Sequence, residues 1–404
     1  MGARRLSWVQ VVLASCTVVA LMVFSPWSGP GAEKRRSVAV TLKGVQAEVY
    51  GFLFAEAAYE TTGTDGDEFL NIIPFNGGRE ASDELLFSVK ATRLGLNLRP
   101  EPTEPGRLTG WGNVEIDFDT GDGAPRIRHA FAELNHPAVN LLAGQTWAVV
   151  AQLSPRTINS DNGFNLGNVY ERVPQIRVWS EHPVGAGAVN WQFGVMQFFG
   201  DKDQTALAVQ QTGAGTDFRI DLANVPQFQG RLAYRWGERG AGYFALSGSV
   251  GKVEVEDSAG RQRDVTHHLV AAELFVPIDS FHLSLEGFYG KAGGFNSGVG
   301  QSVAIRSDGT AEGIRSAGGF AEVGYAFSPA VDVNLFYGVD DPVNSVGGTL
   351  MRIKKNETVG GNVFWNITRH FTAATEVQYV KTSYSASDFE ADDTRVTVAF
   401  YFNF

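Results

Sequence analysis

Hydrophobic and polar residues alternate strictly through the last stretch of the chain, from Asp392 to Phe404. The apolar members of this alternation are Val396, Val398, Phe400, Phe402 and Phe404. A period of two predicts a β-strand with one apolar face. A run of this kind is typical of a strand that meets lipid on one side and water on the other. Because unpaired backbone groups are costly in a membrane, we expect this strand to pair with the first strand of a closed barrel.

From Ala47 onward the chain divides into similar alternating segments, separated by breaks rich in turn residues. Short breaks lie near Arg99–Gly106, His136–Pro137, His182–Gly187, Gly237–Gly240, Pro277–Ser280, Ser328–Pro329 and Thr368–His370. Long breaks lie near Thr61–Ser82, Val149–Pro174, Gly200–Val225, Glu256–Arg263, Lys291–Ile314, Asp340–Asn356 and Ser383–Asp392, and the short break Gly121–Pro125 takes a long-break position. Such alternation of short turns and long loops predicts an all-β fold, a transmembrane antiparallel β-barrel of about 16 strands. A barrel of that size encloses an aqueous channel.

Alternation also assigns faces within individual segments. In Gln227–Trp236 the residues expected to face lipid are Phe228, Leu232, Tyr234 and Trp236, and those expected to face the lumen are Gln227, Gln229, Arg231 and Arg235. The segments Leu108–Asp119, Val331–Tyr337 and Phe371–Tyr379 follow the same rule. In Leu85–Leu98 the alternation changes phase near Arg93, as it does at a β-bulge.

Composition supports export and a polar interior. Only 19% of the 404 residues are charged, Gly is abundant at 47, and after the first segment no apolar run approaches the length of a spanning helix. The net charge of −11 argues against nucleic-acid binding. No cofactor and no metal site is expected, because the sequence contains no His/Glu metal spacing and no Walker loop.

The amino-terminal residues have the order of a secretory signal peptide. Arg4 and Arg5 precede the apolar run Leu6–Phe24, and small or helix-breaking residues follow up to Ala32. We therefore expect a signal peptide at 1–32, a short periplasmic arm at 33–46 and the barrel at 47–404. The only cysteine, Cys16, lies inside the signal peptide, so no disulfide is expected in the exported chain.

Charged residues on the expected lumen face are unevenly distributed. Basic residues belong mainly to the early strands: Arg93, Arg126, Arg128, Arg177, Arg231 and Arg235. Acidic residues prevail later, with two early exceptions: Glu115, Asp117, Glu273, Glu286, Glu322, Asp332 and Glu376. A basic arc facing an acidic wall would create a transverse field that orients anionic or dipolar solutes. Solvated charges are also ordinary in any water-filled lumen, so a constriction is a hypothesis for the set and not for any single arginine.

The long break Val149–Pro174 is the candidate constriction loop. It carries Arg156, Asp161, Glu171 and Arg172 among Asn and Gly residues, with few apolar anchors. A polar loop of this length is unusual unless it is functional or disordered. In a barrel we expect it to fold inward and narrow the pore, with its two acidic residues pairing with the basic arc and its two arginines extending that arc.

Several short motifs carry a family resemblance. Leu142–Trp147 (LAGQTW), then a loop, then Arg172–Arg177 (RVPQIR) resemble the DcaP-like family of trimeric outer-membrane porins. Arg126–Ala130 (RIRHA), Arg93–Gly95 (RLG) and Val49–Phe52 (VYGF) are similar too, and the match is densest between residues 47 and 180. The terminal Phe404 resembles the carboxy-terminal signature of bacterial outer-membrane barrels.

The resemblance implies a passive channel for small hydrophilic solutes, favouring anions such as dicarboxylates or aromatic acids. By position it makes Arg93, Arg128 and Arg177 the best candidates for the pore eyelet, with Asp161 and Glu171 opposite. It implies a homotrimer in the Gram-negative outer membrane, in contact with lipid and lipopolysaccharide. The small, apolar outer faces expected around Leu142 and Gly144 agree with that assembly. The long coiled-coil-like arm of some relatives is absent, and the loop is less aromatic than the family pattern, which leaves the solute open.

Two alternatives remain at this point. A barrel-form enzyme would need a nucleophile beside one of the candidate histidines, His129, His267, His268 or His282, and no recognisable motif supplies one. An adhesive barrel with an impermeable lumen could bind a hard cation in the acidic loop Thr64–Glu68, although that loop lacks a defined ligand spacing. We therefore predict a porin and not an enzyme.

Overall fold

The computed structural model describes most of the barrel and parts of its outer loops. The described residues are 39–42, 44–62, 70–73, 82–100, 108–159, 162–197, 209–211, 218–221, 225–237, 241–257, 262–293, 299, 302–305, 310–343, 353–385 and 389–404. The expected signal peptide and the first residues of the expected arm therefore lie outside the described part of the chain. Among the described residues, no helix has the length and apolar character needed to cross a membrane.

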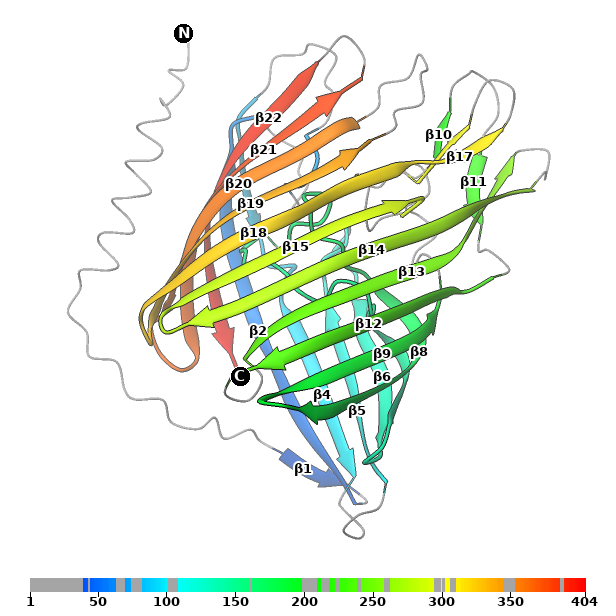
Figure 1. The fold of residues 1–404 in the computed structure, drawn as a ribbon. Coiled ribbons are helices and arrows are strands. Elements are labelled where there is room, and N and C mark those ends of the chain that lie inside the picture. The colour runs from blue at the N-terminus through cyan, green and yellow to red at the C-terminus, as the bar shows by residue number, and fades with distance from the viewer. Residues whose placement is uncertain are drawn as a thin grey trace.

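Sixteen antiparallel strands form one closed wall, in chain order around the barrel (Figure 1). The wall strands are β2 (Val45–Glu60), β3 (Glu84–Ser88) together with β4 (Arg93–Pro100), β5 (Thr109–Asp117), β6 (Arg126–Asn135), β7 (Asn140–Trp147), β8 (Arg172–Val184), β9 (Gly187–Met196), β12 (Gln227–Trp236), β13 (Gly242–Asp257), β14 (Gln262–Ile278), β15 (Phe281–Lys291), β18 (Arg315–Ser328), β19 (Val331–Pro342), β20 (Ile353–Asn366), β21 (Phe371–Tyr384) and β22 (Glu390–Asn403). The predicted all-β antiparallel barrel is confirmed.

The first and last wall strands close the barrel, as the carboxy-terminal pattern predicts. β2 pairs with β22 from Phe52–Asn403 to Glu60–Arg395. Gly51 and Phe404 exchange backbone hydrogen bonds of 3.3 and 3.1 Å at the end of this seam. Closure leaves no free strand edge, which is the condition for a sheet to stand in lipid.

The wall has an apolar outer face and a polar inner face. Neighbouring residues of β19 show the contrast, since Leu335 is 65% exposed and Asn334 is 0% exposed. Phe400 and Phe402 on β22, and Phe404 directly after it, are likewise exposed outward. The predicted lipid and lumen faces of these strands are confirmed, and the exposed apolar belt is the surface that lipid would cover.

The predicted phase change near Arg93 is an interruption of one wall strand. Residues 89–92 separate β3 from β4, and both pieces pair with β2. Thr92 fills the gap, because its Oγ1 accepts a 3.0 Å hydrogen bond from the backbone N–H of Phe54. Side chains on β3 and β4 therefore follow different phases.

Connections at the two ends of the barrel differ in length. β8 and β9 are joined by a two-residue turn in which Gly185 has a φ of +59°, a conformation suited to a tight hairpin. At the opposite end, β10 (Val209–Gln211) pairs with β16 (Val303–Ile305), which pairs with β17 (Ala311–Gly313), and β11 (Phe218–Asp221) pairs with β13 (Figure 1). Part of the expected arm forms β1 (Ala39–Leu42), a hairpin partner of β2.

Candidate functional site: a constriction loop and an arginine cluster

The connection between β7 and β8, residues 148–171, leaves the wall and crosses the lumen; we call it the constriction loop. Its apolar side chains pack against the far wall, with Val150 and Val169 beside Phe288 of β15. Ile158 reaches further round, to a cluster containing Phe54 and Phe364. The predicted inward fold is confirmed. The expectation of few apolar anchors was wrong, because most apolar residues of the loop are buried against the wall.

The outgoing half of the loop is held by side-chain acceptors on successive wall strands. Gln229 on β12 accepts hydrogen bonds from the backbone N–H groups of Val149 and Val150 at 2.8 and 2.9 Å. Further along, Glu322 on β18 accepts from the backbone N–H of Arg156 at 2.5 Å.

At its far end the loop reaches β21 and turns back. Glu376 on β21 accepts from the N–H groups of Ile158 and Asn159 at 2.8 and 3.2 Å. On the return, Asn356 on β20 donates to the carbonyl of Asn165 at 2.8 Å, and Glu286 on β15 accepts from Val169 N–H at 2.9 Å.

Close approach of the returning half requires a glycine on the wall. A Cβ atom placed on Gly338 of β19 would collide with the carbonyl oxygen of Leu166. Backbone therefore lies directly on backbone at this point, which only glycine permits.

These contacts change the picture of an acidic wall facing an open pore. Glu286, Glu322 and Glu376 are 5%, 2% and 2% exposed, and each accepts a hydrogen bond from the loop backbone. Their carboxylates therefore fasten the loop and do not face solute across the lumen. The expectation that they form the free acidic side of a transverse field was wrong.

The loop keeps a polar side toward the lumen. Gln152, Ser154 and Arg156 are exposed, whereas the alternate residues Ala151 and Leu153 are buried. Arg156 pairs with Asp332 of the wall at 3.0 Å and lies 4.2 Å from the ring centre of Phe364. The expectation that Arg156 extends the basic arc was therefore wrong, because it lies on the acidic side.

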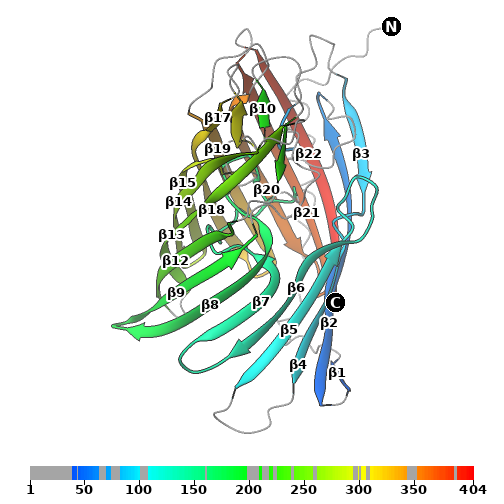
Figure 2. The same cartoon turned by 90° about the vertical axis from the view of Figure 1, so that its right-hand side faces the viewer.

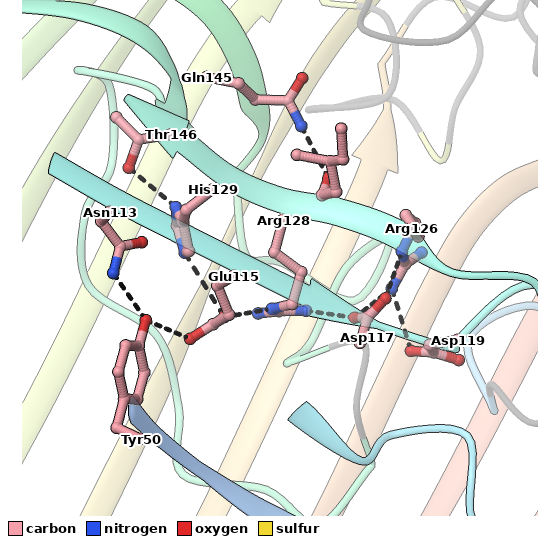
Figure 3. A network of polar contacts seen from close by, with 11 residues as sticks. Tyr50, Asn113, Glu115, Asp117, Asp119, Arg126, Arg128, His129, Gln145 and Thr146 are labelled. Atoms are coloured by element: carbon pink, nitrogen blue, oxygen red, sulfur yellow. Dashed lines mark hydrogen bonds and ion pairs between the residues drawn. The ribbon is translucent and has the colours of Figure 1, made fainter. Parts of the chain in front are cut away.

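Arginines of the early strands form a compact cluster with three carboxylates (Figure 3). Arg128 donates to Glu115 at 2.7 Å and to Asp117 at 2.8 Å. Arg126 donates to both oxygens of Asp117, at 2.9 and 2.8 Å, and to Asp119 at 3.2 Å. We call this arrangement the ladder. Each of the two guanidinium groups is in contact with two carboxylates, and the three carboxylates leave the ladder with one excess negative charge.

The network continues to neighbouring strands through neutral groups. Tyr50 on β2 donates from its hydroxyl to Glu115 at 3.0 Å and accepts from Asn113 at 2.8 Å (Figure 3). His129 Nδ1 lies 3.0 Å from Thr146 Oγ1, and its Nε2 lies 3.8 Å from Glu115. The ladder is thus fixed on both sides.

Two further arginines adjoin the ladder without a carboxylate contact of their own. The Nε atom of Arg93 and the Nη1 atom of Arg172 are buried and find no hydrogen-bond acceptor in the described part of the chain. Arg93 lies 5.3 Å from the ring centre of Phe52, and Arg172 lies 5.1 Å from that of Trp147. Both lie within electrostatic range of Arg128. We call Arg93, Arg126, Arg128 and Arg172 the arginine cluster.

The remaining predicted arginines lie elsewhere. Arg177 donates to the carbonyl of Trp147 at 3.3 Å, and its Nε atom has no acceptor among the described residues. Arg231 is paired through two hydrogen bonds with Glu273, at 3.0 and 2.9 Å. Arg235 lies 3.6 Å from Glu181. The prediction that Arg231 and Glu273 belong to opposite charged walls was wrong, since they compensate each other.

Two acidic loop residues expected opposite the arginines have different outcomes. Asp161 lies outside the described residues. Glu171 directly precedes β8, and its carbonyl accepts a 2.8 Å hydrogen bond from Ala148 N–H, which closes the base of the loop. It is therefore next to Arg172 in the chain and not across the pore from it.

Leu142 departs from its expected outer position. It is 1% exposed and is paired with Arg177 of β8, whereas Leu141 beside it is 42% exposed. The alternation in β7 keeps its period of two, with Leu142 and Thr146 buried on one face and Leu141 and Ala143 exposed on the other. The outward residues of this strand are thus Leu141 and Ala143.

The histidines considered for catalysis occupy hydrogen-bonded positions in the wall. His267 is 1% exposed, and its Nε2 lies 2.6 Å from Ser249 Oγ, which is itself 5% exposed. His282 lies 3.0 Å from Glu322. Within the described ranges, no three His, Cys, Asp or Glu side chains gather as a metal site. Residues 63–69 of the acidic outer loop lie outside those ranges.

Sequence reasoning placed Gln229 and Glu376 on the lumen face but missed that they hold the loop. It also missed the role of Asn356 and the aromatic residues beside the arginines. Trp147 and Tyr170, whose ring centres are 5.1 Å apart, lie at the two ends of the loop.

A wall of sixteen strands with a long loop folded into the lumen defines the class of outer-membrane diffusion porins. No protein-family model matches this sequence, and no characterised protein sequence does. Several solved structures are similar to it in fold. The outer-membrane channel DcaP of Acinetobacter baumannii is similar with a TM-score of 0.70 and 20% identity, over 90% of this chain and 99% of that one.

Other porins are similar at lower scores. The anion-selective porin of Comamonas acidovorans has a TM-score of 0.57 and 13% identity, over 89% of this chain and 100% of that one. OmpF of Salmonella typhi has a TM-score of 0.59 and 13% identity, over 91% of this chain and 100% of that one. The predicted DcaP-like barrel is thereby confirmed at the level of the fold, which is an outer-membrane porin fold.

Proposed function

We propose that this protein is a passive channel of the Gram-negative outer membrane that favours small anionic solutes. The observation that carries the proposal is an imbalance of free charge beside the constriction loop. Arg93, Arg126, Arg128 and Arg172 bring four guanidinium groups together with three carboxylates, whereas Glu322 and Glu376 of the far wall accept hydrogen bonds from the loop backbone.

Anionic groups fit such donors for a physical reason. A carboxylate that passes the constriction loses part of its hydration, and the positive charge of the half-buried Arg93 and Arg172 offsets part of that loss. The phenyl ring of Phe52 and the indole of Trp147 beside the arginines offer flat apolar surfaces. These features support dicarboxylates and aromatic acids as solutes, and a neighbour of the same fold is named an anion-selective porin.

Assembly and surroundings are part of the proposal. The exposed apolar belt would contact lipid and, in the outer leaflet, lipopolysaccharide. Three copies are proposed to associate through the outward faces of early strands, where β7 presents Leu141 and Ala143.

Planar-bilayer recording tests the channel and its selectivity together. The expected result is current steps in groups of three, with a reversal potential shifted toward that of the anion under a salt gradient. Arg172→Gln and Arg93→Gln should each shift the reversal potential toward the cation value, because each removes one positive charge from the arginine cluster. Arg99→Gln is the control, since Arg99 is 52% exposed in its side chain and paired with Glu48 at 2.8 Å.

Two results would contradict the proposal. Absence of current from a folded, heat-modifiable barrel would remove the channel function. A reversal potential that responds to Arg99→Gln as strongly as to Arg172→Gln would show that the arginine cluster has no special influence on selectivity.

A further inference from the structure

A chain of buried side chains leads away from Val149 and Val150, which we call the root of the constriction loop. Gln229 Oε1 accepts the backbone N–H groups of Val149 and Val150, and Gln229 Nε2 donates to Gln227 Oε1 at 3.1 Å. Both glutamines are 2% exposed. Water therefore has little access to replace a bond that one of them loses.

The chain continues to a histidine on β14 and ends at an outer loop. Gln227 Nε2 lies 3.0 Å from His267 Nε2, and Ser249 Oγ lies 2.6 Å from the same nitrogen. His267 Nδ1 lies 2.9 Å from the carbonyl oxygen of Ala292, the first residue after β15. Side chains on three wall strands thus join this loop to the constriction loop.

The direction of every bond in this chain is fixed. A carbonyl oxygen only accepts, so the proton of neutral His267 is on Nδ1 and Nε2 is the acceptor. Gln227 must then turn its NH2 group toward His267 and its oxygen toward Gln229. Gln229 must in turn present its oxygen to Val149 and Val150.

We propose that Gln229, Gln227 and His267 form a proton-responsive relay that positions the root of the constriction loop. A second proton on His267 turns Nε2 into a donor, which then opposes the NH2 group of Gln227. If the side-chain amide of Gln227 rotates by half a turn, its NH2 group opposes the NH2 group of Gln229. If the amide of Gln229 also rotates, the two loop N–H groups lose their acceptor. In each arrangement one pair of donors faces each other without an acceptor between them.

The surroundings of His267 contain few charges. The groups that face the ring are the neutral Gln227 of β12 and Ser249 of β13, the carbonyl of Ala292, and backbone of Lys291 on β15; the charged or titratable neighbours are His268 and Lys291. His268 follows His267 in β14 and is exposed on the outer face. It is therefore a matched control.

The outer loop that begins at Ala292 also contacts the returning half of the constriction loop. Val299 packs in one buried cluster with Leu166 of the constriction loop. The relay therefore connects the first residues of the constriction loop to this outer loop, and the returning half contacts it directly.

The test is amide hydrogen exchange of the peptide containing Val149 and Val150, in the folded full-length barrel at about pH 7.5 and about pH 3.5. Comparing variants at the same pH removes the intrinsic pH dependence of exchange. At the lower pH, the wild-type peptide should exchange about threefold to tenfold faster than in His267→Gln, as expected for loss of one hydrogen bond. His268→Gln should behave as the wild type.

Gln227→Leu separates the relay from a general effect of acid. It removes the link between His267 and Gln229 and leaves Gln229 as the acceptor of both loop N–H groups, so the acid response should disappear. An acid response that persists in Gln227→Leu, or one that is equal in His267→Gln and the wild type, would overturn the relay.

Bilayer recording under the same conditions distinguishes this inference from the proposed function, on which its effect on conduction rests. We expect brief current interruptions to become more frequent at low pH in the wild type and not in His267→Gln. No current at any pH, with exchange as expected, would refute the channel and leave the relay standing. Normal current together with exchange that does not depend on His267 would refute the relay and leave the channel function standing.

Discussion

Replacing Glu376 tests whether buried carboxylates hold the constriction loop. Its Oε2 atom accepts Ile158 N–H at 2.8 Å and Asn362 Nδ2 at 2.9 Å, and its Oε1 atom accepts Asn159 N–H at 3.2 Å. Glu376→Ala leaves two backbone donors of the loop without an acceptor. Each unsatisfied buried donor costs about 1–3 kcal/mol, so docking of this part of the loop loses about 2–6 kcal/mol.

The opposing contribution comes from the apolar anchor at the same place. Ile158 is 3% exposed and packs near Phe54 and Phe364. Full burial of such a side chain stabilises by about 1.5–3 kcal/mol. The two magnitudes are comparable, so we expect the far end of the loop to leave the wall for a large fraction of the time while the barrel stays folded. Glu376→Gln keeps one oxygen acceptor, so its detached fraction should lie between those of the wild type and Glu376→Ala.

Hydrogen exchange over residues 156–159 measures this detachment directly, and single-channel current noise measures its effect on the pore. Asp332→Asn is the control. Its partner Arg156 belongs to the same loop, but the pair is 26% and 42% exposed, and exposed ion pairs contribute about 0–1 kcal/mol. Unchanged exchange in Glu376→Ala, or equal effects of Glu376→Ala and Asp332→Asn, would refute the view that the buried acid holds the loop.

Three further predictions test the packing of the loop, the ladder and the barrel seam. Gly338→Ala should raise exchange around Leu166 and change the open current, because the new Cβ collides with the loop backbone, and an unchanged current would contradict that contact. Glu115→Gln should shift the reversal potential further toward the anion value, because it removes a carboxylate that is paired with Arg128; a shift toward the cation value would contradict the influence of the ladder on selectivity. Arg395→Ala leaves Glu60 buried without its ion-pair partner across the β2–β22 seam, so the free energy of unfolding should fall by about 3–5 kcal/mol, measured by heat-modifiability on gels. Little change in the unfolding temperature would rule that pair out as a support of the seam.

The strand faces could be predicted from sequence because lipid and water act on each residue locally. The alternation around Leu335 and Asn334 is readable without knowing any partner strand. Leu142 shows where this fails, since it is an apolar residue on the inner face of β7, where hydrophobicity alone assigns it to the lipid side.

The pairing of charges could not be predicted because it depends on register between strands. Glu115 and Arg128 meet only because β5 and β6 pair with a register shift between Glu115 and Ile116. In the sequence, Glu115 is simply an acidic residue among basic ones. The loop contacts are still less accessible, because Ile158 and Glu376 are 218 positions apart in the chain.

Selectivity in this lumen is better understood from the charges that remain uncompensated than from the numbers of basic and acidic residues. The sequence has more acidic than basic residues, with a net charge of −11. Yet Glu322 and Glu376 accept hydrogen bonds from loop backbone, and Glu273 is paired with Arg231. Charge that is already hydrogen-bonded gives a passing solute little, since its donors and acceptors are occupied. Under the proposed function, the excess of four guanidinium groups over three carboxylates in the arginine cluster and ladder decides the sign of the selectivity, so a net acidic protein would still favour anions.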